Sequence, residues 1–227
     1  MTRTGDTGYQ VLESKFYLPG AVSLARELLG MILVSDQPEG VTAGRITETE
    51  AYAGASDAAC HAYGRTTQDP RHRTSAMFEA GGHAYVYLIY GMYCCFNVSA
   101  NAPGEPEAVL IRALEPIEGL ELMARRRGVA RDELESAGGL KKLCAGPGKL
   151  SMALGITRDN NGTDLTLGQG LFIAKGDCPP DHDILATPRI NVDYSKEAAL
   201  YPYRFVIAGS KFLSTRRYLS QADTGKK

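Results

Sequence analysis

Two carboxylates and an aromatic ring alternate in the segment ETEAY at residues 48–52. Side chains two residues apart on a β-strand point to the same face, so Glu48, Glu50 and Tyr52 would share one face with Ile46. On most strands such a polar row is open to solvent. The other interpretation is the wall of a cleft, where a carboxylate beside an aromatic ring orients and deprotonates a water molecule.

A pair of carboxylates is also the machinery of glycoside hydrolysis, in which the two groups flank the bond that is cleaved. Glu48 and Glu50 are only two residues apart, so on a strand their side chains point in parallel. Parallel side chains are poorly placed to flank one bond, so this arrangement does not favour a glycoside hydrolase pair.

Four of the twelve tyrosines lie close together in the segment YVYLIYGMYCCFN at residues 85–97. Tyr85, Tyr87 and Tyr93 share one parity, which is typical of core aromatics on strands. Tyr90 lies at a predicted hairpin turn, and an aromatic side chain at an exposed tip is more often a contact residue than a packing residue. It could stack on a nucleic-acid base, which contributes about 1–3 kcal/mol per base, or insert between base steps.

Basic side chains gather in the glycine-containing loop predicted at residues 53–82. Arg65, Arg71 and Arg73 lie there with only Asp69 among them. A solvated loop and a set of contacts to backbone phosphates explain this cluster about equally well.

Two other segments carry basic residues that could contact phosphate. The sequence Gly-Pro-Gly-Lys at 146–149 resembles a phosphate-binding loop, but a Walker motif would need glycine in place of Leu143 and a hydroxyl residue in place of Leu150. NTPase chemistry is therefore disfavoured, whereas glycines that open a helix with Lys149 at its start can hold one backbone phosphate. Residues 203–217 contain four basic residues and no acidic one.

The overall charge is balanced, with 25 lysines and arginines against 26 aspartates and glutamates in 227 residues. This balance excludes a histone-like protein that holds nucleic acid by bulk charge, but not one that uses a local patch. No stretch approaches the roughly 18 apolar residues of a membrane helix. Residues 1–10 lack the apolar core of a signal peptide. We therefore expect no membrane partner and a cytoplasmic location, in the bacterial nucleoid, or a nuclear one in a eukaryote.

The cysteines and histidines do not form a metal-binding pattern. The four histidines contain no HxxxH pair, and the five cysteines contain no CxxC spacing. We expect no metal and no cofactor. An odd number of cysteines without a secretory signal indicates free thiols.

The hydrophobic pattern predicts one mixed α/β (α+β) domain around a curved, mainly antiparallel sheet with surrounding helices. The expected helices are at residues 20–29, 116–127 and 149–154. The expected strands are at residues 31–35, 43–52, two within 84–100, and 108–114, followed by the short runs LTLG, LFIA, TPRINV and RFVIAG.

No linker divides the chain. We expect a single domain over residues 16–217, preceded by a short N-terminal segment, 1–15, and followed by a polar tail, 218–227. Residues 128–142 are polar, and we expect them to be mobile.

Several of these segments together carry a specific resemblance. The segments GRITETEAY, RTSAMF, YVYLIYGMYCCFNVS, AVLIRALEP and LCAGPGKL occur in this order, with His61 after the first. In these motifs the chain resembles the alkyladenine (3-methyladenine) DNA glycosylase family, also called alkylpurine-DNA glycosylases. The resemblance covers residues 16–214, and ETEAY together with YVYLIYGMY is far more specific than either cluster alone. Because few residues precede the resemblance, we expect no long N-terminal extension of the kind that some relatives carry.

The resemblance implies an enzyme of base excision repair. Such an enzyme flips alkylated or deaminated purines, such as 3-methyladenine, out of duplex DNA and hydrolyses the N-glycosidic bond, which leaves an abasic site. The implied fold is a single mixed α/β domain with a protruding β-hairpin that enters the minor groove. The implied partner is double-stranded DNA that contains a damaged purine, and we expect the enzyme to act as a monomer.

The resemblance also implies roles for individual residues. Glu50 would activate the attacking water, and Tyr90 would intercalate where the base has left the helix. The implied substrate-binding residues are Tyr52, His61, Tyr87, Asn97 and Arg112. Asn97 would clash with the 2-amino group of normal guanine. The expected contacts to the DNA backbone are Arg65, Arg71, Arg73 and Lys149.

Two alternatives use only part of this pattern. A non-catalytic module that binds damaged DNA would need the tyrosine hairpin but not Glu50. A hydrolase of free nucleosides would need Glu50 but not an exposed Tyr90. The presence of both features disfavours both alternatives.

Overall fold

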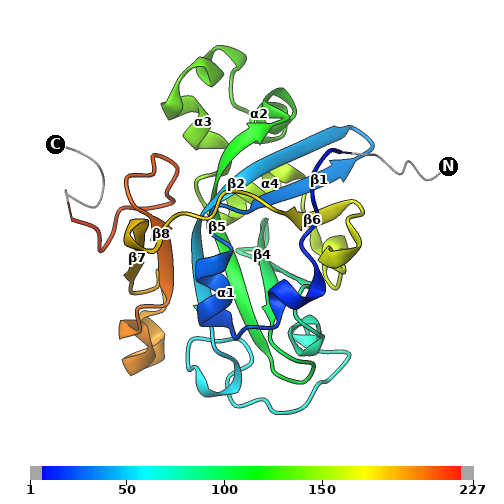
Figure 1. The fold of residues 1–227 in the computed structure, drawn as a ribbon, viewed down its shortest axis with the longest axis vertical. Coiled ribbons are helices and arrows are strands. Elements are labelled where there is room, and N and C mark those ends of the chain that lie inside the picture. The colour runs from blue at the N-terminus through cyan, green and yellow to red at the C-terminus, as the bar shows by residue number, and fades with distance from the viewer. Residues whose placement is uncertain (1–6, 221–227) are drawn as a thin grey trace.

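In the computed structural model, which describes residues 7–220, eight strands form one curled antiparallel sheet (Figure 1). The strands are β1 (Ile32–Gln37), β2 (Gly40–Tyr52), β3 (Ala84–Ile89), β4 (Tyr93–Ala100), β5 (Glu107–Glu118), β6 (Leu171–Ala174), β7 (Ile184–Thr187) and β8 (Arg204–Ile207). They pair in the order β3-β4-β5-β2-β1-β6, and β8 pairs with both β2 and β7. Every pair is antiparallel, so the prediction of a mixed α/β fold around a mainly antiparallel sheet is confirmed.

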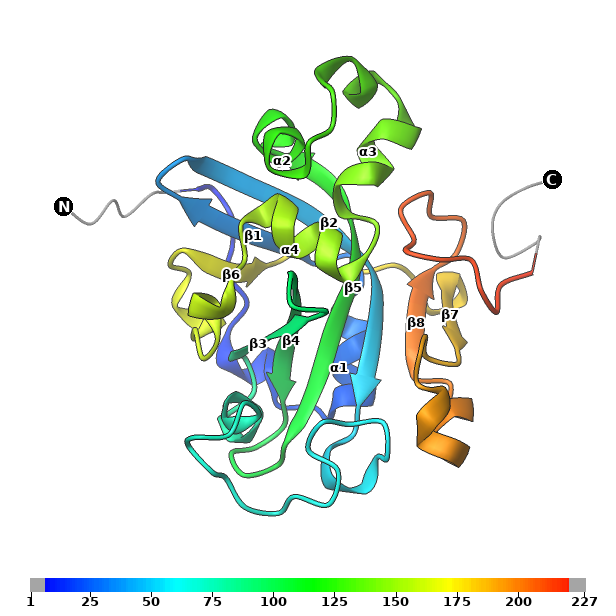
Figure 2. The ribbon, with the colours of Figure 1, turned by 180° about the vertical axis from the view of Figure 1, so that it is seen from behind.

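Helices cover both faces of the sheet. The helix α1 (Ala21–Glu27) lies on the near face in Figure 1, and α4 (Pro147–Leu154) lies on the opposite face, which Figure 2 shows. The helices α2 (Leu120–Arg127) and α3 (Ala137–Cys144) lie together at one end of the sheet. Short 3-10 segments connect these elements: η1 (Ser14–Tyr17), η2 (Gly54–Ser56), η3 (Ser75–Phe78), η4 (Arg131–Glu135), η5 (Arg158–Asn160), η6 (Leu165–Leu167), η7 (Asp181–Asp183) and η8 (Asp193–Leu200).

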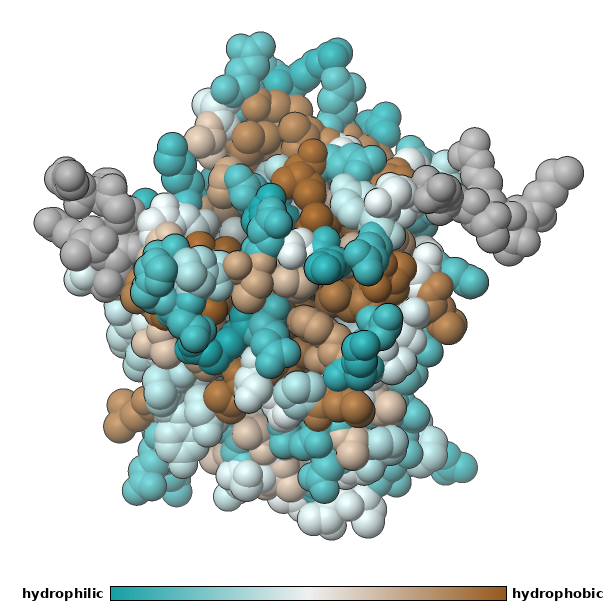
Figure 3. All heavy atoms as spheres, viewed as in Figure 1, coloured by the Kyte–Doolittle hydropathy of each residue, from teal (hydrophilic) through white to brown (hydrophobic). Residues whose placement is uncertain are grey.

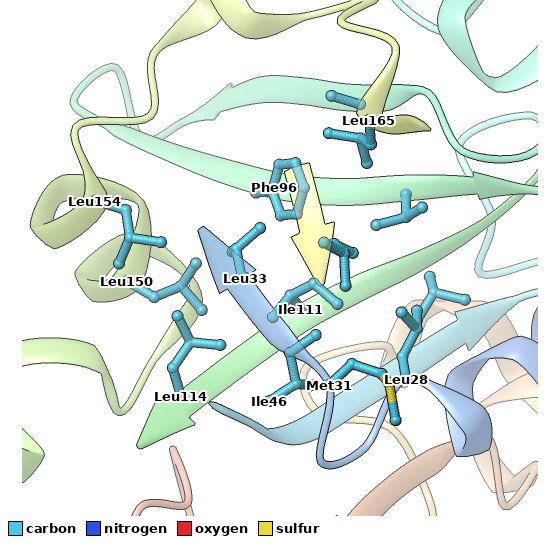
Figure 4. Close-up of a cluster of buried hydrophobic side chains, with 14 of the residues drawn as sticks. Leu28, Met31, Leu33, Ile46, Phe96, Ile111, Leu114, Leu150, Leu154 and Leu165 are labelled. Atoms are coloured by element: carbon cyan, nitrogen blue, oxygen red, sulfur yellow. The ribbon is translucent and has the colours of Figure 1, made fainter. Parts of the chain in front are cut away.

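The main hydrophobic core joins the sheet to α4. Leu150 and Leu154 lie four residues apart, so they share one face of this helix, and both are fully buried. They belong to one cluster with Ile111 and Leu114 of β5 and Phe96 of β4 (Figure 4). Burying each leucine contributes about 1.5–3 kcal/mol. Truncating Leu150 to alanine would therefore cost about 2–5 kcal/mol of stability, because a cavity would remain.

The strand β2 changes the face that it presents along its length. Its ladder with β5 shifts register between Ile46 and Glu48, and again between Glu48 and Thr49. Such bulges re-aim the side chains on either side of them. Ile46 consequently lies in the main core, whereas Glu48 and Glu50 turn away from it. The strand prediction is confirmed, but the prediction that Ile46 shares a face with the two glutamates is wrong.

Pro116 lies inside β5, so the prediction that it opens a helix is wrong. It stands opposite Gly44 at a register shift, where its missing N–H interrupts the ladder least. A Cβ at residue 44 would lie 2.9 Å from the Cβ of Leu114, so glycine lets the two strands approach each other there. The helix α2 begins only after Gly119, whose φ of 72° turns the chain out of the strand.

Of the four short runs predicted as strands, two form strands and two do not. LFIA and RFVIAG form β6 and β8 as predicted, but LTLG forms the 3-10 segment η6. The run TPRINV contains only the last residue of β7, because Pro188 cannot donate to the next ladder bond. Residues 128–142 contain η4 and most of α3, whose capping residue Ser136 accepts a 3.0 Å hydrogen bond from the amide of Gly139.

The surface carries both hydrophobic and hydrophilic residues (Figure 3). On the face in Figure 3, hydrophobic residues lie between hydrophilic ones. Among residues 7–220, no helix is both long and apolar enough to cross a membrane. The predicted N-terminal segment, 1–15, and polar tail, 218–227, fall partly outside the described residues.

Candidate active site

The β3–β4 hairpin forms one side of a pocket of about 660 Å³. As predicted, residues 90–92 join the two strands. A cavity of this size is typical of sites for small molecules or single bases. The structure brings all five predicted substrate-binding residues to its walls: Tyr52, His61, Tyr87, Asn97 and Arg112.

Three aromatic rings form one wall of this pocket. The ring of His61 packs edge-on against Tyr87, with 4.7 Å between centroids, and Tyr85 lies 5.3 Å from Tyr87. A hydrogen bond of 2.9 Å between His61 Nδ1 and the Tyr85 hydroxyl fixes the imidazole. The guanidinium of Arg73 lies 6.0 Å from the centroid of Tyr87 at the same wall. These contacts pre-arrange a surface on which a planar ligand can stack.

The rings of His61 and Tyr87 are uncharged at neutral pH, although the charged Arg73 lies beside them. Burial, with a smaller contribution from the charge of Arg73, lowers the pKa of His61 to about 4. Burial likewise raises the pKa of Tyr87 far above its ordinary value. Both side chains therefore present neutral rings to whatever occupies the pocket.

Glu50 lies directly behind the pocket wall and is fully buried. Its Oε2 accepts hydrogen bonds from the Tyr52 hydroxyl at 2.9 Å and from Arg112 Nη1 at 3.1 Å. Its Oε1 accepts a hydrogen bond of 2.7 Å from the amide of Ile190. All three donor residues line the pocket, so only the groups that bind the carboxylate separate it from the cavity.

Glu48 is equally buried, but it does not line the pocket. Its Oε1 accepts hydrogen bonds from Arg112 Nε at 2.9 Å and Arg204 Nε at 2.8 Å, and its Oε2 accepts one from the amide of Ser214 at 2.6 Å. Burial raises the pKa of Glu48, but the charges of Arg112 and Arg204 outweigh burial and hold this pKa below its ordinary value. Glu48 is therefore a permanent anion that holds Arg112 in place.

Asn97 lines the pocket from β4 and is 4% exposed. Its Nδ2 donates to the carbonyl of Tyr85 at 2.9 Å and to that of Cys95 at 3.4 Å. These two bonds fix which way the amide points, because only the nitrogen can donate.

Tyr90 lies at the tip of the hairpin, at the edge of the pocket, and is 83% exposed. Its φ is 53°, in the left-handed region, and Gly91 follows with a φ of 71°. A type I′ hairpin turn requires positive φ at both central residues. Tyrosine adopts this conformation at a cost of roughly 1–2 kcal/mol. The tip therefore presents a solvent-exposed aromatic ring from a residue with a strained backbone conformation.

The predicted phosphate contacts surround the pocket unevenly. Arg73 lines it, whereas Arg65 and Arg71 do not. Arg71 and Lys149 are exposed, and Arg65 is half-buried. Lys149 follows Gly148, which lines the pocket from the start of α4.

Lys149 and Arg216 both lie near a third basic residue, Lys141. The sequence marked Lys149 and Arg216 as basic sites but not Lys141. Burial and the nearby charges of Arg216 and Lys149 lower the pKa of Lys141. Arg204, by contrast, is fully buried against Glu48. The basic stretch at 203–217 is therefore not wholly a surface feature.

Two buried residues beside the site were missed by the sequence patterns. Arg189 pairs with Asp57, although 132 positions separate them in the chain. Arg189 directly precedes Ile190, which donates to Glu50. No local spacing marks such a pair, because two distant segments of the fold create it.

All five cysteines are free thiols, and burial raises the pKa of Cys60 to about 11. Among residues 7–220, no three His, Cys, Asp or Glu side chains gather as metal ligands would.

Comparison with known proteins assigns this chain to the class of DNA glycosylases, which are hydrolases of N-glycosyl bonds. Residues 15–211 match the model of the methylpurine-DNA glycosylase family. The chain belongs to the methylpurine-DNA glycosylase family, as its motifs over residues 16–214 predicted. Its substrate is accordingly DNA.

Curated relatives match over nearly their whole length. A protein of Methanocella arvoryzae is 47% identical over 206 residues, which cover 91% of this chain and 96% of the relative. A protein of Bacillus mycoides is 45% identical over 202 residues, covering 88% and 97%. A protein of Bacillus cereus is 44% identical over 204 residues, with the same coverage. Each of the three carries, provisionally, the name 3-methyladenine DNA glycosylase.

Proposed function

We propose that this enzyme removes alkylated or deaminated purines, such as 3-methyladenine, from duplex DNA by base flipping and hydrolysis with a Glu50-activated water. It acts as a monomer, because one pocket receives one flipped base. The observation that carries this proposal is the buried carboxylate of Glu50 behind an aromatic pocket whose edge bears the exposed Tyr90.

The hairpin tip provides the means of base flipping. A base inside the duplex stack is out of reach, so the enzyme must extrude it and stabilise the gap. Tyr90 has the exposure and the aromatic ring that such a wedge needs. The exposed neighbours Leu88 and Met92 add apolar surface at the same tip. The hairpin thus supplies both the wedge and one wall of the pocket.

The uncharged aromatic rings of the pocket suit an alkylated purine. N3- or N7-alkylated purine nucleosides carry a positive charge, which a tyrosine face attracts by roughly 0.5–2 kcal/mol. The neutral imidazole of His61 stacks without repelling this charge, since its pKa is about 4. Asn97 serves as a filter, because its fixed side chain would clash with the 2-amino group of normal guanine.

Glu50 supplies the base for hydrolysis. A carboxylate accepts about four hydrogen bonds, so a water can bind Glu50 beside its donors Tyr52, Arg112 and Ile190. The water oxygen attacks C1′ of the deoxyribose, and one water proton passes to Glu50. The C1′–N9 bond breaks, and its electron pair leaves with the purine. The carboxylate also stabilises the positive charge that develops on the sugar.

A base-release assay tests this proposal. Duplex DNA methylated with dimethyl sulfate is incubated with excess enzyme, and the release of methylated purines is followed. We expect Glu50→Gln to lower the release rate by about 10²–10⁴-fold while its affinity for the duplex stays within a few-fold. Glu115→Gln makes the same chemical change on the outer part of β5 and should leave the rate unchanged.

The same assay separates the alternatives. A free-nucleoside hydrolase would release base from methylated monomers as fast as from duplex, which would overturn the flipping step. A wild-type enzyme that binds the methylated duplex but releases no base would instead be a binding module. Normal rates in Glu50→Gln would overturn the role of Glu50 alone.

A further inference from the structure

Arg189 is fully buried, and its partners come from three segments around the pocket. Its Nη1 lies 2.5 Å from Asp57 Oδ2, and its Nη2 lies 2.9 Å from Asp57 Oδ1. Nη1 also donates to the carbonyl of Ala51 in β2 at 2.8 Å, and Nη2 donates to that of Ala198 in η8 at 3.0 Å. The guanidinium therefore ties β2, the loop after it and η8 together.

Asp57 extends this connection into the pocket wall. Its carboxylate accepts hydrogen bonds from the amides of Ala53 at 3.1 Å and Ala59 at 3.0 Å. Ala59 lines the pocket, and the Tyr194 hydroxyl donates to its carbonyl at 3.2 Å. Neither Asp57 nor Arg189 lines the pocket itself. The pair therefore acts on the cavity only through its neighbours.

The pair reaches two of the three groups that hold Glu50. The guanidinium carbon of Arg189 lies 4.9 Å from the centroid of the Tyr52 ring, whose hydroxyl donates to Glu50 Oε2. The residue after Arg189 is Ile190, whose amide donates to Glu50 Oε1. Anchoring the Arg189 side chain fixes the backbone from which this amide points.

We propose that Arg189 and Asp57 are positioning residues, which hold the Tyr52 hydroxyl and the Ile190 amide on Glu50. This inference rests on the proposed function, because it assumes that Glu50 activates the water. A catalytic group must be held within a fraction of an ångström, and a misplacement of about 1 Å can cost 10²-fold in rate. A bidentate guanidinium–carboxylate pair gives the fixed geometry that this task needs.

The substitution Arg189→Lys tests the role while keeping the charge. A lysine ammonium cannot bind Asp57 in a bidentate way and also reach the carbonyls of Ala51 and Ala198. We expect Arg189→Lys and Asp57→Asn each to lower base release from dimethyl-sulfate-treated duplex by at least about 10-fold. Affinity for the duplex should stay within a few-fold, so the loss falls on kcat rather than on KM.

A double-mutant comparison separates positioning from a merely structural role. If Arg189 acts through Glu50, then Arg189→Lys causes no further loss in a Glu50→Gln background. A merely structural role would lower the rate by the same factor in both backgrounds, which would overturn the inference.

Arg126→Lys is the matched control. Arg126 is another largely buried arginine, which binds the carbonyl of Ala153 at 3.1 Å and Gln37 at 3.1 Å away from the pocket. The Arg126→Lys variant should lose stability but keep the wild-type rate of base release. If the wild-type enzyme released no base from the methylated duplex, the proposed function itself would be refuted. A normal wild type and an impaired Glu50→Gln, together with unchanged Arg189→Lys and Asp57→Asn, would refute only the positioning role.

Discussion

The guanidinium of Arg112 lies 3.1 Å from the carboxylate of Glu50, and its other edge lies 2.9 Å from Glu48. Arg112 is thus shared by two buried carboxylates, and their charges raise its pKa despite its burial. Burial of a charge is tolerated only when it is paired; Arg112 pairs with both anions, and Arg204 is a second cation beside Glu48.

Arg112→Gln should therefore damage both stability and activity. Removing the cation leaves Glu50 without a charged partner, and loss of one member of a buried pair costs about 3–5 kcal/mol. We expect base release to fall by about 10²-fold, because Glu50 also loses a fixed orientation. The stability and the release rate of Arg112→Lys should lie between those of wild type and Arg112→Gln, since one ammonium cannot bridge Glu48 and Glu50. Thermal unfolding and single-turnover release measure both effects, and a stable Arg112→Gln with a normal rate would contradict the role.

Tyr90→Asn should weaken activity without weakening the fold. Asparagine tolerates positive φ better than tyrosine, so the free energy of unfolding should stay constant or rise by up to about 1 kcal/mol. Release of methylated purines from duplex should fall by about 10-fold or more, because stacking at the gap contributes about 1–3 kcal/mol. Leu167→Ala, which removes another exposed apolar side chain, is the control and should change neither quantity. An unchanged rate in Tyr90→Asn would remove the hairpin tip from the mechanism.

The sequence predicted what local patterns encode. Alternation in residues 43–52 predicted β2. The β-forming residues within 84–100 predicted the β3–β4 hairpin, and Gly91 marked the turn between its strands. The same motifs predicted the family, which the match over residues 15–211 confirms. Strand periodicity and turn residues act within a few positions, so a single sequence is enough to read them.

Long-range pairing created the features that the sequence did not predict. Ile46 lies on an unexpected face because bulges in the ladder with β5 depend on a partner strand. No local pattern indicated that Arg204 and Arg189 are buried, since isolated arginines are rarely buried. Each is buried only because a carboxylate from a distant segment, Glu48 or Asp57, meets it in the fold.

Lys149→Gln should reduce the salt dependence of DNA binding. If Lys149 contacts one phosphate, its loss lowers the slope of log K against log salt by about 0.9, equally for damaged and undamaged duplex. Fluorescence anisotropy at several salt concentrations measures the slope. Lys175→Gln removes an exposed lysine next to β6, away from the pocket, and should leave the slope unchanged. Equal slopes for Lys149→Gln and wild type would exclude this phosphate contact.

His61 should make the protein less stable as the pH falls from about 6.5 to about 4. Its pKa is about 4 in the folded protein but about 6.5 when unfolded, so the unfolded chain binds the proton first. This difference lowers the free energy of unfolding by up to about 3 kcal/mol across that window and has no effect above it. His61→Gln should therefore show a flatter dependence in urea unfolding between pH 7 and pH 4.5. His182→Gln, at an exposed histidine, should retain the wild-type slope, and equal slopes in all three proteins would contradict the burial of a neutral His61.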